Sequence, residues 1–73
     1  MADHGITNTI RRMRFEHGEM TQQVLADRVG VSRQTIVAIE KGKYSPSLAL
    51  AFRISRSFGR PLEEVFQYQD QTP

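Results

Sequence analysis

Apolar side chains recur along the chain at spacings of three and four residues, the period of a helix with one buried face. No run of four residues alternates between apolar and polar in the way that a half-buried strand requires. Glycine, proline and small hydroxyl residues divide the helical pattern into short segments. The pattern predicts five helices, which cover approximately residues 8–17, 22–29, 33–41, 48–58 and 62–66.

Hydroxyl or amide side chains precede the first four predicted helices, where they can accept a backbone N–H group. These residues are Thr7 or Asn8, Thr21, Ser32 and Ser47. Pro61 can open the fifth helix, because its fixed φ suits the first helical turn. We therefore expect an all-α fold, a compact five-helix bundle that occupies residues 6–67. Residues 1–5 are expected to form a flexible N-terminus and residues 68–73 a short C-terminal tail.

Composition narrows the possible classes of function. The chain has no cysteine, which rules out thiolate metal sites and cysteine nucleophiles and fits a reducing compartment. No apolar run approaches the roughly 20 residues that a membrane span needs, so we expect a cytoplasmic protein with no membrane partner. His4 and His17 are too isolated for a metal site, and the adjacent Glu63 and Glu64 point about 100° apart on a helix. We therefore expect neither an enzyme nor a bound cofactor or metal.

Charge is distributed unevenly along the chain. Residues 1–60 hold all ten Lys and Arg and five acids, whereas residues 61–73 hold three acids and no Lys or Arg. This leaves a net charge of +5 on the first segment and −3 on the second. A basic body with an acidic end is typical of a protein that binds a polyanion on one side. From charge alone, the alternative of solvated surface charge with a chance skew stays open.

The predicted helix 33–41 presents a polar face that its own packing does not require. On a helical wheel Ile36 and Ile39 must point inward, so the opposite face points outward. Its residues are Arg33, Gln34, Val37, Ala38 and Lys41. Arginine can bind guanine, and glutamine adenine, with two hydrogen bonds in the DNA major groove, and small apolar groups can contact the thymine methyl. Without further context these residues could equally be ordinary solvated surface.

The turn before this helix favours the DNA-binding interpretation. The predicted helices 22–29 and 33–41 are joined only by Val29-Gly30-Val31 and a capping serine. Gly30 can adopt the left-handed conformation that so sharp a turn needs. Ala26 is small enough to let the predicted helix 33–41 approach helix 22–29 closely.

This stretch resembles the helix-turn-helix of the phage repressor and Cro class, also called the xenobiotic-response-element family. The residues that carry the resemblance are Thr21, Gln22, Leu25, Ala26, Val29, Gly30, Val31, Ser32, Ile36, Ile39, Glu40, Gly42 and Lys43. With the flanking helices it covers about residues 6–67, and residues 21–41 form the motif itself. The resemblance implies a bundle of the lambda-repressor-like DNA-binding type and a double-stranded DNA partner.

The resemblance also implies roles for individual residues. Those at base-reading positions are Arg33 and Gln34, with Thr35, Val37 and Ala38 as secondary contacts. Those at phosphate-contacting positions are Gln22, Ser32, Lys41, Lys43 and Ser45. Arg14 and Glu40 match a pair that forms a buried ion pair in this family, so we assign Arg14 to structure and not to DNA.

The C-terminal part of the chain is rich in large apolar residues for so small a core. These are Phe52, Leu62, Val65, Phe66 and Tyr68. They could all pack internally, but we expect them to include the interface of a homodimer. A twofold pair of recognition helices about 34 Å apart would match one turn of DNA.

Together these features predict a sequence-specific transcriptional regulator of double-stranded DNA. We expect a repressor that binds a pseudo-palindromic operator as a homodimer, with no small-molecule effector domain. The alternative is a protein-interaction module, antitoxin-like or an adaptor, that keeps the helix-turn-helix fold without reading DNA.

Overall fold

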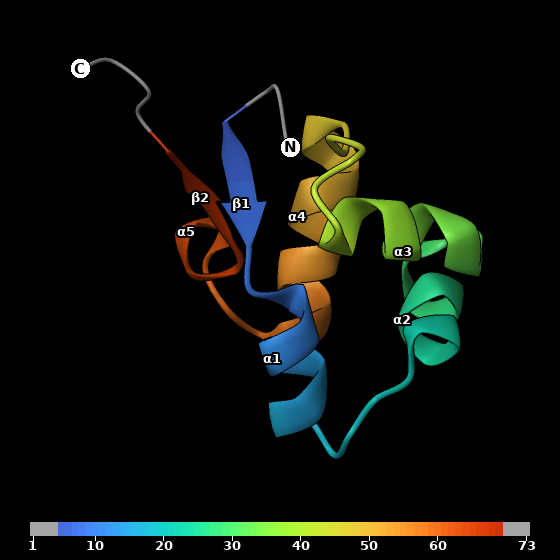
Figure 1. Cartoon of the computed structure of the whole chain (residues 1–73). Coiled ribbons are helices and arrows are strands. Elements are labelled where there is room, and N and C mark those ends of the chain that lie inside the picture. The colour runs from blue at the N-terminus through green and yellow to red at the C-terminus, as the bar shows by residue number, and fades with distance from the viewer. Residues whose placement is uncertain (1–4, 70–73) are drawn as a thin grey trace.

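The computed structural model describes residues 5–69 and contains five helices and two short strands (Figure 1). In chain order these are β1 (Ile6–Asn8), α1 (Ile10–Glu16), α2 (Gln22–Val29), α3 (Arg33–Glu40), α4 (Leu48–Phe58), α5 (Leu62–Val65) and β2 (Phe66–Tyr68). The five predicted helices are confirmed, and α2 and α4 have the predicted bounds. No helix among the described residues is long and apolar enough to cross a membrane.

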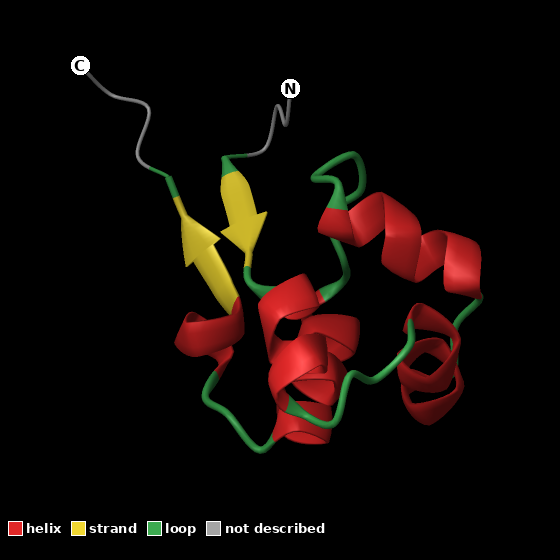
Figure 2. Cartoon of the chain, turned by 60° about the horizontal axis from the view of Figure 1, so that its bottom comes forward, coloured by secondary structure: helices red, strands yellow, loops and turns green. Residues whose placement is uncertain are grey.

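The two strands correct the all-α expectation. β1 and β2 pair as an antiparallel two-stranded sheet, with Ile6 opposite Tyr68 and Asn8 opposite Phe66 (Figure 2). The backbone pairing continues past the strands at both ends. The Thr9 N–H donates to the Val65 carbonyl at 2.9 Å, and the Gln69 N–H donates to the Gly5 carbonyl at 2.6 Å. Strands of three residues are too short to show an alternating pattern, so periodicity could not reveal them.

The sheet also includes residues outside the expected bounds of the bundle. Tyr68 was assigned to the tail, yet it lies in β2. Gly5 and Gln69 were assigned to the ends, yet they are joined by a backbone hydrogen bond. Residues 1–4 and 70–73, which include His4, lie outside the described residues.

Three of the predicted helix caps are present. Thr21, Ser32 and Ser47 each accept the backbone N–H three residues on, at 3.0, 3.2 and 3.1 Å. The first helix differs, because α1 begins at Ile10 with Thr9 at its N-cap position and no side-chain cap bond from that residue. Instead, Asn8, the residue before Thr9, accepts the Ile10 N–H with its side-chain oxygen at 3.1 Å.

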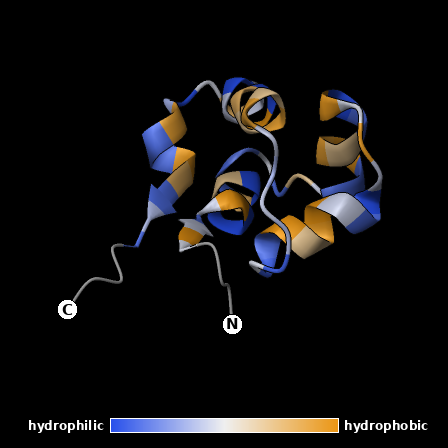
Figure 3. Cartoon of the chain, turned by 90° about the horizontal axis from the view of Figure 1, so that it is seen from above, coloured by the Kyte–Doolittle hydropathy of each residue, from blue (hydrophilic) through white to orange (hydrophobic). Residues whose placement is uncertain are grey.

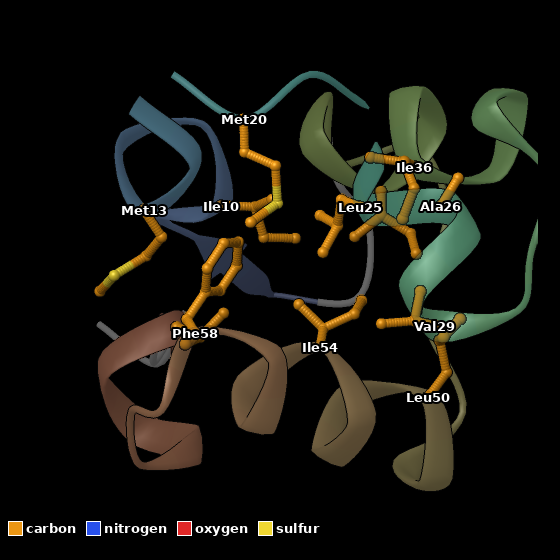
Figure 4. Packing of buried hydrophobic residues seen from close by; sticks show 12 residues of the cluster. Ile10, Met13, Met20, Leu25, Ala26, Val29, Ile36, Leu50, Ile54 and Phe58 are labelled. Atoms are coloured by element: carbon orange, nitrogen blue, oxygen red, sulfur yellow. The ribbon is translucent and has the colours of Figure 1, made fainter. Parts of the chain in front are cut away.

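The core lies where α1, α2, α3 and α4 converge. Figure 3 shows hydrophobic and hydrophilic segments alternating along single helices, as the amphipathic pattern predicts. In Figure 4, Ile54 and Phe58 of α4 point toward Ile10 and Leu25, which come from α1 and α2. Ile10, Leu25 and Ile54 are fully buried. Because α4 supplies one side of this core, it holds the α2–α3 pair against the rest of the domain.

Candidate nucleic-acid interface

The first turn of α3 exposes the two residues that were expected to read bases. Arg33 and Gln34 are exposed, and neither side chain has an ion pair or hydrogen bond within residues 5–69. The cap fixes the direction of the helix start, since Ser32 accepts the Thr35 N–H and the two hydroxyl oxygens lie 3.0 Å apart. The guanidinium and the carboxamide are therefore available to an external partner.

The rest of α3 divides into an inner and an outer face as predicted. Ile36 and Ile39 are buried, with 0% and 1% of their surface exposed. We call the opposite side the reading face, and its residues are Arg33, Gln34, Val37, Ala38 and Lys41. Val37 and Ala38 are half-buried, and Lys41 is exposed.

Hollows flank α3 on both sides. On one side an open groove of about 1060 Å³ runs between α1, the start of α2 and the length of α3, where Arg33, Val37 and Lys41 contribute to its wall. On the other side a smaller hollow of about 270 Å³ includes Gln34, Ala38 and Tyr44. Residues of the reading face thus line both hollows.

The larger groove is strongly basic, and sequence reasoning missed part of it. Arg11 and Arg12 on α1 line it together with Arg33 and Lys41, and all four are exposed. Its wall also contains Phe15, which is 67% exposed. The signal that could have found Arg11 and Arg12 is the concentration of positive charge in Arg11, Arg12 and Arg14, three arginines within four positions.

The turn between α2 and α3 is held by its backbone and by α4. Gly30 has φ of 78°, and its N–H and that of Val31 both donate to the Ala26 carbonyl, at 2.9 and 3.0 Å. A Cβ at position 30 would meet no atom within 4 Å, so the backbone angle and not space requires glycine. Arg53 of α4, to which the sequence assigned no role, donates to the Val29 carbonyl at 3.1 Å.

The expected ion pair between α1 and the end of α3 is present. Arg14 Nε donates to Glu40 Oε2 at 2.7 Å and Arg14 Nη2 to Glu40 Oε1 at 3.0 Å, a bidentate pair. The third guanidinium nitrogen donates to the Met20 carbonyl at 2.8 Å. The side chains are only 14% and 9% exposed. All three guanidinium nitrogens of Arg14 therefore have partners inside the domain, and the side chain fixes the C-terminal end of α3 relative to α1.

A second contact fixes the same end of α3. The Asn8 side-chain amide donates to the Ile39 carbonyl at 2.9 Å. The sequence predicts only a capping role for Asn8. Because Asn8 belongs to β1, this hydrogen bond ties the recognition helix directly to the two-stranded sheet.

The residues expected to contact phosphate occupy different environments. Lys41, Lys43 and Ser32 are exposed, and Ser45 is half-buried. The Lys43 N–H donates to the Ala38 carbonyl at 2.9 Å, which places the loop after α3 beside its last turn. Gln22 is half-buried, and its amide donates to Glu40 at 3.3 Å, so this side chain partly serves the ion pair. It still lines the basic groove.

One of the candidate dimer residues is excluded by its position. Val65 is fully buried inside the domain, so its side chain cannot contact a partner. Phe66 packs partly against the same core, and Leu62 is half-buried. Phe52 and Tyr68 remain on the surface, with 45% and 73% of their area exposed.

His17 has a structural role in the described part of the chain. Its two ring nitrogens lie 2.8 Å from the Met13 carbonyl oxygen and 3.0 Å from that of Phe58. The ring also contacts the Phe58 ring, with centroids 5.2 Å apart. The histidine therefore holds the end of α1 against the end of α4.

Comparison with known proteins agrees with this geometry. A family model described as helix-turn-helix matches residues 10–65. The uncharacterized HTH-type transcriptional regulator MJ0272 of Methanocaldococcus jannaschii is 54% identical over 63 residues, 86% of this chain and 94% of that protein. The uncharacterized HTH-type transcriptional regulator YgzD of Bacillus subtilis is 42% identical over 64 residues, 88% and 96% of the two chains. The cryptic phage CTXphi transcriptional repressor RstR of Vibrio cholerae is 32% identical over 59 residues, 81% of this chain and 52% of RstR.

The fold and its exposed α3 define a helix-turn-helix protein. The chain belongs to the helix-turn-helix family of DNA-binding transcriptional regulators, which is not a family of enzymes.

Proposed function

We propose that the protein is a cytoplasmic repressor that binds a pseudo-palindromic operator as a homodimer and reads the major groove with α3. Arg33 and Gln34 make the principal base contacts, with Thr35, Val37 and Ala38 beside them. The observation that carries this proposal is the exposure of the Arg33 and Gln34 side chains in the first turn of α3. Its guanidinium and carboxamide are exposed and without partners among the described residues, which is the arrangement that bidentate base recognition needs.

Contacts with the DNA backbone surround this reading face. We assign them to Lys41, Lys43, Ser32, Ser45 and Gln22, and we add Arg11 and Arg12 because they line the same groove as Arg33. Phosphate contacts fix the register of a protein on DNA but carry no sequence information themselves. Repression is favoured by the relationship to RstR, whose name identifies it as a transcriptional repressor.

A salt titration of DNA binding tests this proposal against the protein-interaction alternative. The logarithm of the binding constant is expected to fall linearly with the logarithm of the salt concentration. The slope should be about −0.9 for each neutralised phosphate, or roughly −3.6 per protomer if Arg11, Arg12, Lys41 and Lys43 each neutralise one. Fluorescence anisotropy of a labelled duplex measures this directly. A binding constant that does not change with salt would favour the protein-interaction module.

The two arginines of α1 can be tested in the same experiment. Changing Arg11→Gln and Arg12→Gln together is expected to make the slope shallower by about 1.8, because two phosphate contacts are lost. Arg56→Gln is the matched control, since Arg56 is exposed on α4 and lies outside the groove. An unchanged slope in the double variant would remove Arg11 and Arg12 from the interface.

A further inference from the structure

The smaller hollow beside α3 differs in chemistry from the basic groove on the other side of the helix. The described residues that line it are Ser32, Gln34, Thr35, Ala38 and Tyr44, and none of them is charged. The larger groove holds four basic side chains, which suit the charged phosphates of a DNA backbone. The uncharged hollow instead suits the edge of a base, and Gln34, one of the two principal reading residues, stands in its wall.

Tyr44 forms the wall of this hollow that does not belong to α3 or its cap. Its side chain is 49% exposed and has no hydrogen bond or ion pair within residues 5–69. It also takes no part in the hydrophobic core of the described domain. The family resemblance implies phosphate contacts for its neighbours Lys43 and Ser45 but gives Tyr44 no role. An exposed aromatic ring beside the reading face is therefore still unexplained.

The position of Tyr44 follows from the way in which α3 ends. The Gly42 N–H donates to the Ile39 carbonyl at 3.0 Å and the Lys43 N–H to the Ala38 carbonyl at 2.9 Å. With Gly42 at φ of 75°, these bonds form a Schellman motif, which closes a helix and fixes the direction of the chain that follows. Figure 1 shows the loop leaving the end of α3 before it reaches α4. Because Tyr44 comes directly after this motif, its side chain shares the hollow with Ala38.

The groups that line the hollow are largely apolar. Ala38 can offer only its methyl group, and Tyr44 offers its ring. The Thr35 hydroxyl oxygen lies 3.0 Å from that of Ser32, so this hydroxyl is used within the helix cap and the methyl group of Thr35 is left for a partner. Among the base edges in the major groove of DNA, the apolar feature is the C5 methyl group of thymine.

We propose that the hollow binds the C5 methyl group of a thymine in each operator half-site and that Tyr44 makes this contact selective. Gln34 hydrogen-bonds an adenine, and the thymine lies next to that adenine. Thr35 and Ala38 contact the methyl group from α3, and the Tyr44 ring covers it from the loop. This inference rests on the proposed function, in which α3 reads the major groove, and it adds a base-selective residue from outside the helix.

A contact between the Tyr44 hydroxyl and a phosphate is the alternative within the same complex. It is disfavoured because the hollow around the ring has no charged lining residue among those described. The two interpretations also differ in sequence dependence. A contact with a methyl group exists only at thymine, whereas a phosphate contact is the same at every base.

Replacing the thymines of the operator one at a time by deoxyuridine tests the proposal. The operator is one selected from random DNA, and the change removes only the C5 methyl group. At one thymine of a half-site, the wild-type protein should lose about fourfold in affinity, the usual effect of burying one methyl group. Tyr44→Ala should lose less than about twofold at the same position, because one wall of the hollow is gone.

Two outcomes of this scan would overturn the proposal. One is an operator that contains no thymine at a fixed position of the half-site. The other is a set of deoxyuridine substitutions that weaken the wild-type and Tyr44→Ala proteins by the same factor at every position. Circular dichroism of Tyr44→Ala should match the wild type, because the exposed side chain has no partner within residues 5–69.

Two further variants separate the ring of Tyr44 from its hydroxyl group and from exposed apolar surface in general. Tyr44→Phe keeps the ring and should keep the loss at deoxyuridine. Leu48→Ala is the matched control, since Leu48 is 66% exposed at the start of α4 and lies outside both hollows. It should also behave like the wild type. If Tyr44→Phe instead weakens binding to operator and scrambled DNA equally, as Tyr44→Ala does, the hydroxyl binds phosphate and the proposal is overturned.

A gain of binding provides the complementary test. Changing the same T·A pair to C·G should weaken binding, because cytosine has no methyl group. 5-Methylcytosine at that position should restore about fourfold for the wild type and less than about twofold for Tyr44→Ala. Since only a methyl group is added, a change in charge cannot explain the recovery. The absence of any recovery with the wild type would contradict a methyl contact.

Measuring the salt dependence on the same samples separates this inference from the proposed function. If the wild-type chain binds the operator with the expected salt slope but no deoxyuridine affects it, the assignment of the hollow is wrong and the function stands. If binding depends neither on salt nor on sequence, the proposed function fails and the inference fails with it.

Discussion

Replacing Glu40 by glutamine is expected to lower the free energy of unfolding by about 3–5 kcal/mol, the usual cost of removing one partner of a buried ion pair. The substitution keeps the size of the side chain but leaves the Arg14 guanidinium, only 14% exposed, without a carboxylate. It also weakens the hydrogen bond that the Gln22 amide donates to Glu40 Oε1. Urea unfolding followed by circular dichroism measures the change.

The surface pair Arg12–Glu16 provides a matched control for this prediction. Its closest atoms are 3.8 Å apart and its side chains are 64% and 46% exposed, so Glu16→Gln should change the stability by less than about 0.5 kcal/mol. The double variant Arg14→Met with Glu40→Leu should recover much of the loss, because it leaves no buried charge unpaired. A loss for Glu40→Gln no larger than that for Glu16→Gln would contradict the structural role of the pair.

Replacing Arg33 by alanine is expected to weaken binding to the operator by a factor corresponding to about 1–3 kcal/mol while changing binding to random DNA much less. The reason is that a bidentate contact with guanine exists only at the correct base. Lys43→Ala should weaken binding to both duplexes by similar factors, because a phosphate contact does not depend on sequence. Titration of each variant against an operator selected from random DNA and against a scrambled duplex measures both effects.

Arg56→Ala serves as the control for these two substitutions, since it removes the same charge as Arg33→Ala from an exposed position outside both hollows. Its effect should be small on either duplex. Equal losses on operator and scrambled DNA for Arg33→Ala would show that this residue contributes charge and not base recognition.

The helices were predictable because their determinants are local. Thr21, Ser32 and Ser47 each cap the helix that follows within three residues of sequence. The burial of Ile36 and Ile39 follows from the wheel of a single helix. A sequence pattern captures such short-range relations well.

The sheet was not predictable for the opposite reason. Ile6 and Tyr68 are at opposite ends of the described chain, and their pairing depends on the whole bundle bringing those ends together. The burial of Val65 has the same origin, because α5 is too short to show which of its sides faces the core. An apolar residue near the C-terminus therefore could not be divided between core and dimer interface from the sequence.

In the candidate site, too, features set by one helix were predictable and features set by packing between helices were not. The composition of the reading face followed from α3 alone, whereas the groove beside it is made by α1, α2 and α3 together. Arg11 and Arg12 become part of that groove only when α1 packs beside the motif. The hydrogen bond from Gln22 to Glu40 likewise depends on the position of a residue 18 places further along the chain.

The most direct test of the central claim, that Arg33 at the start of α3 reads a base, is a double-mutant cycle with a modified operator. Each guanine of the half-site is replaced in turn by 7-deazaguanine, which lacks the N7 acceptor that arginine uses. At one guanine, the wild-type protein should lose about tenfold or more in affinity, whereas Arg33→Ala should lose almost nothing further. If every deazaguanine weakens the wild-type and Arg33→Ala proteins by the same factor, Arg33 does not contact the N7 of any guanine and the account is contradicted.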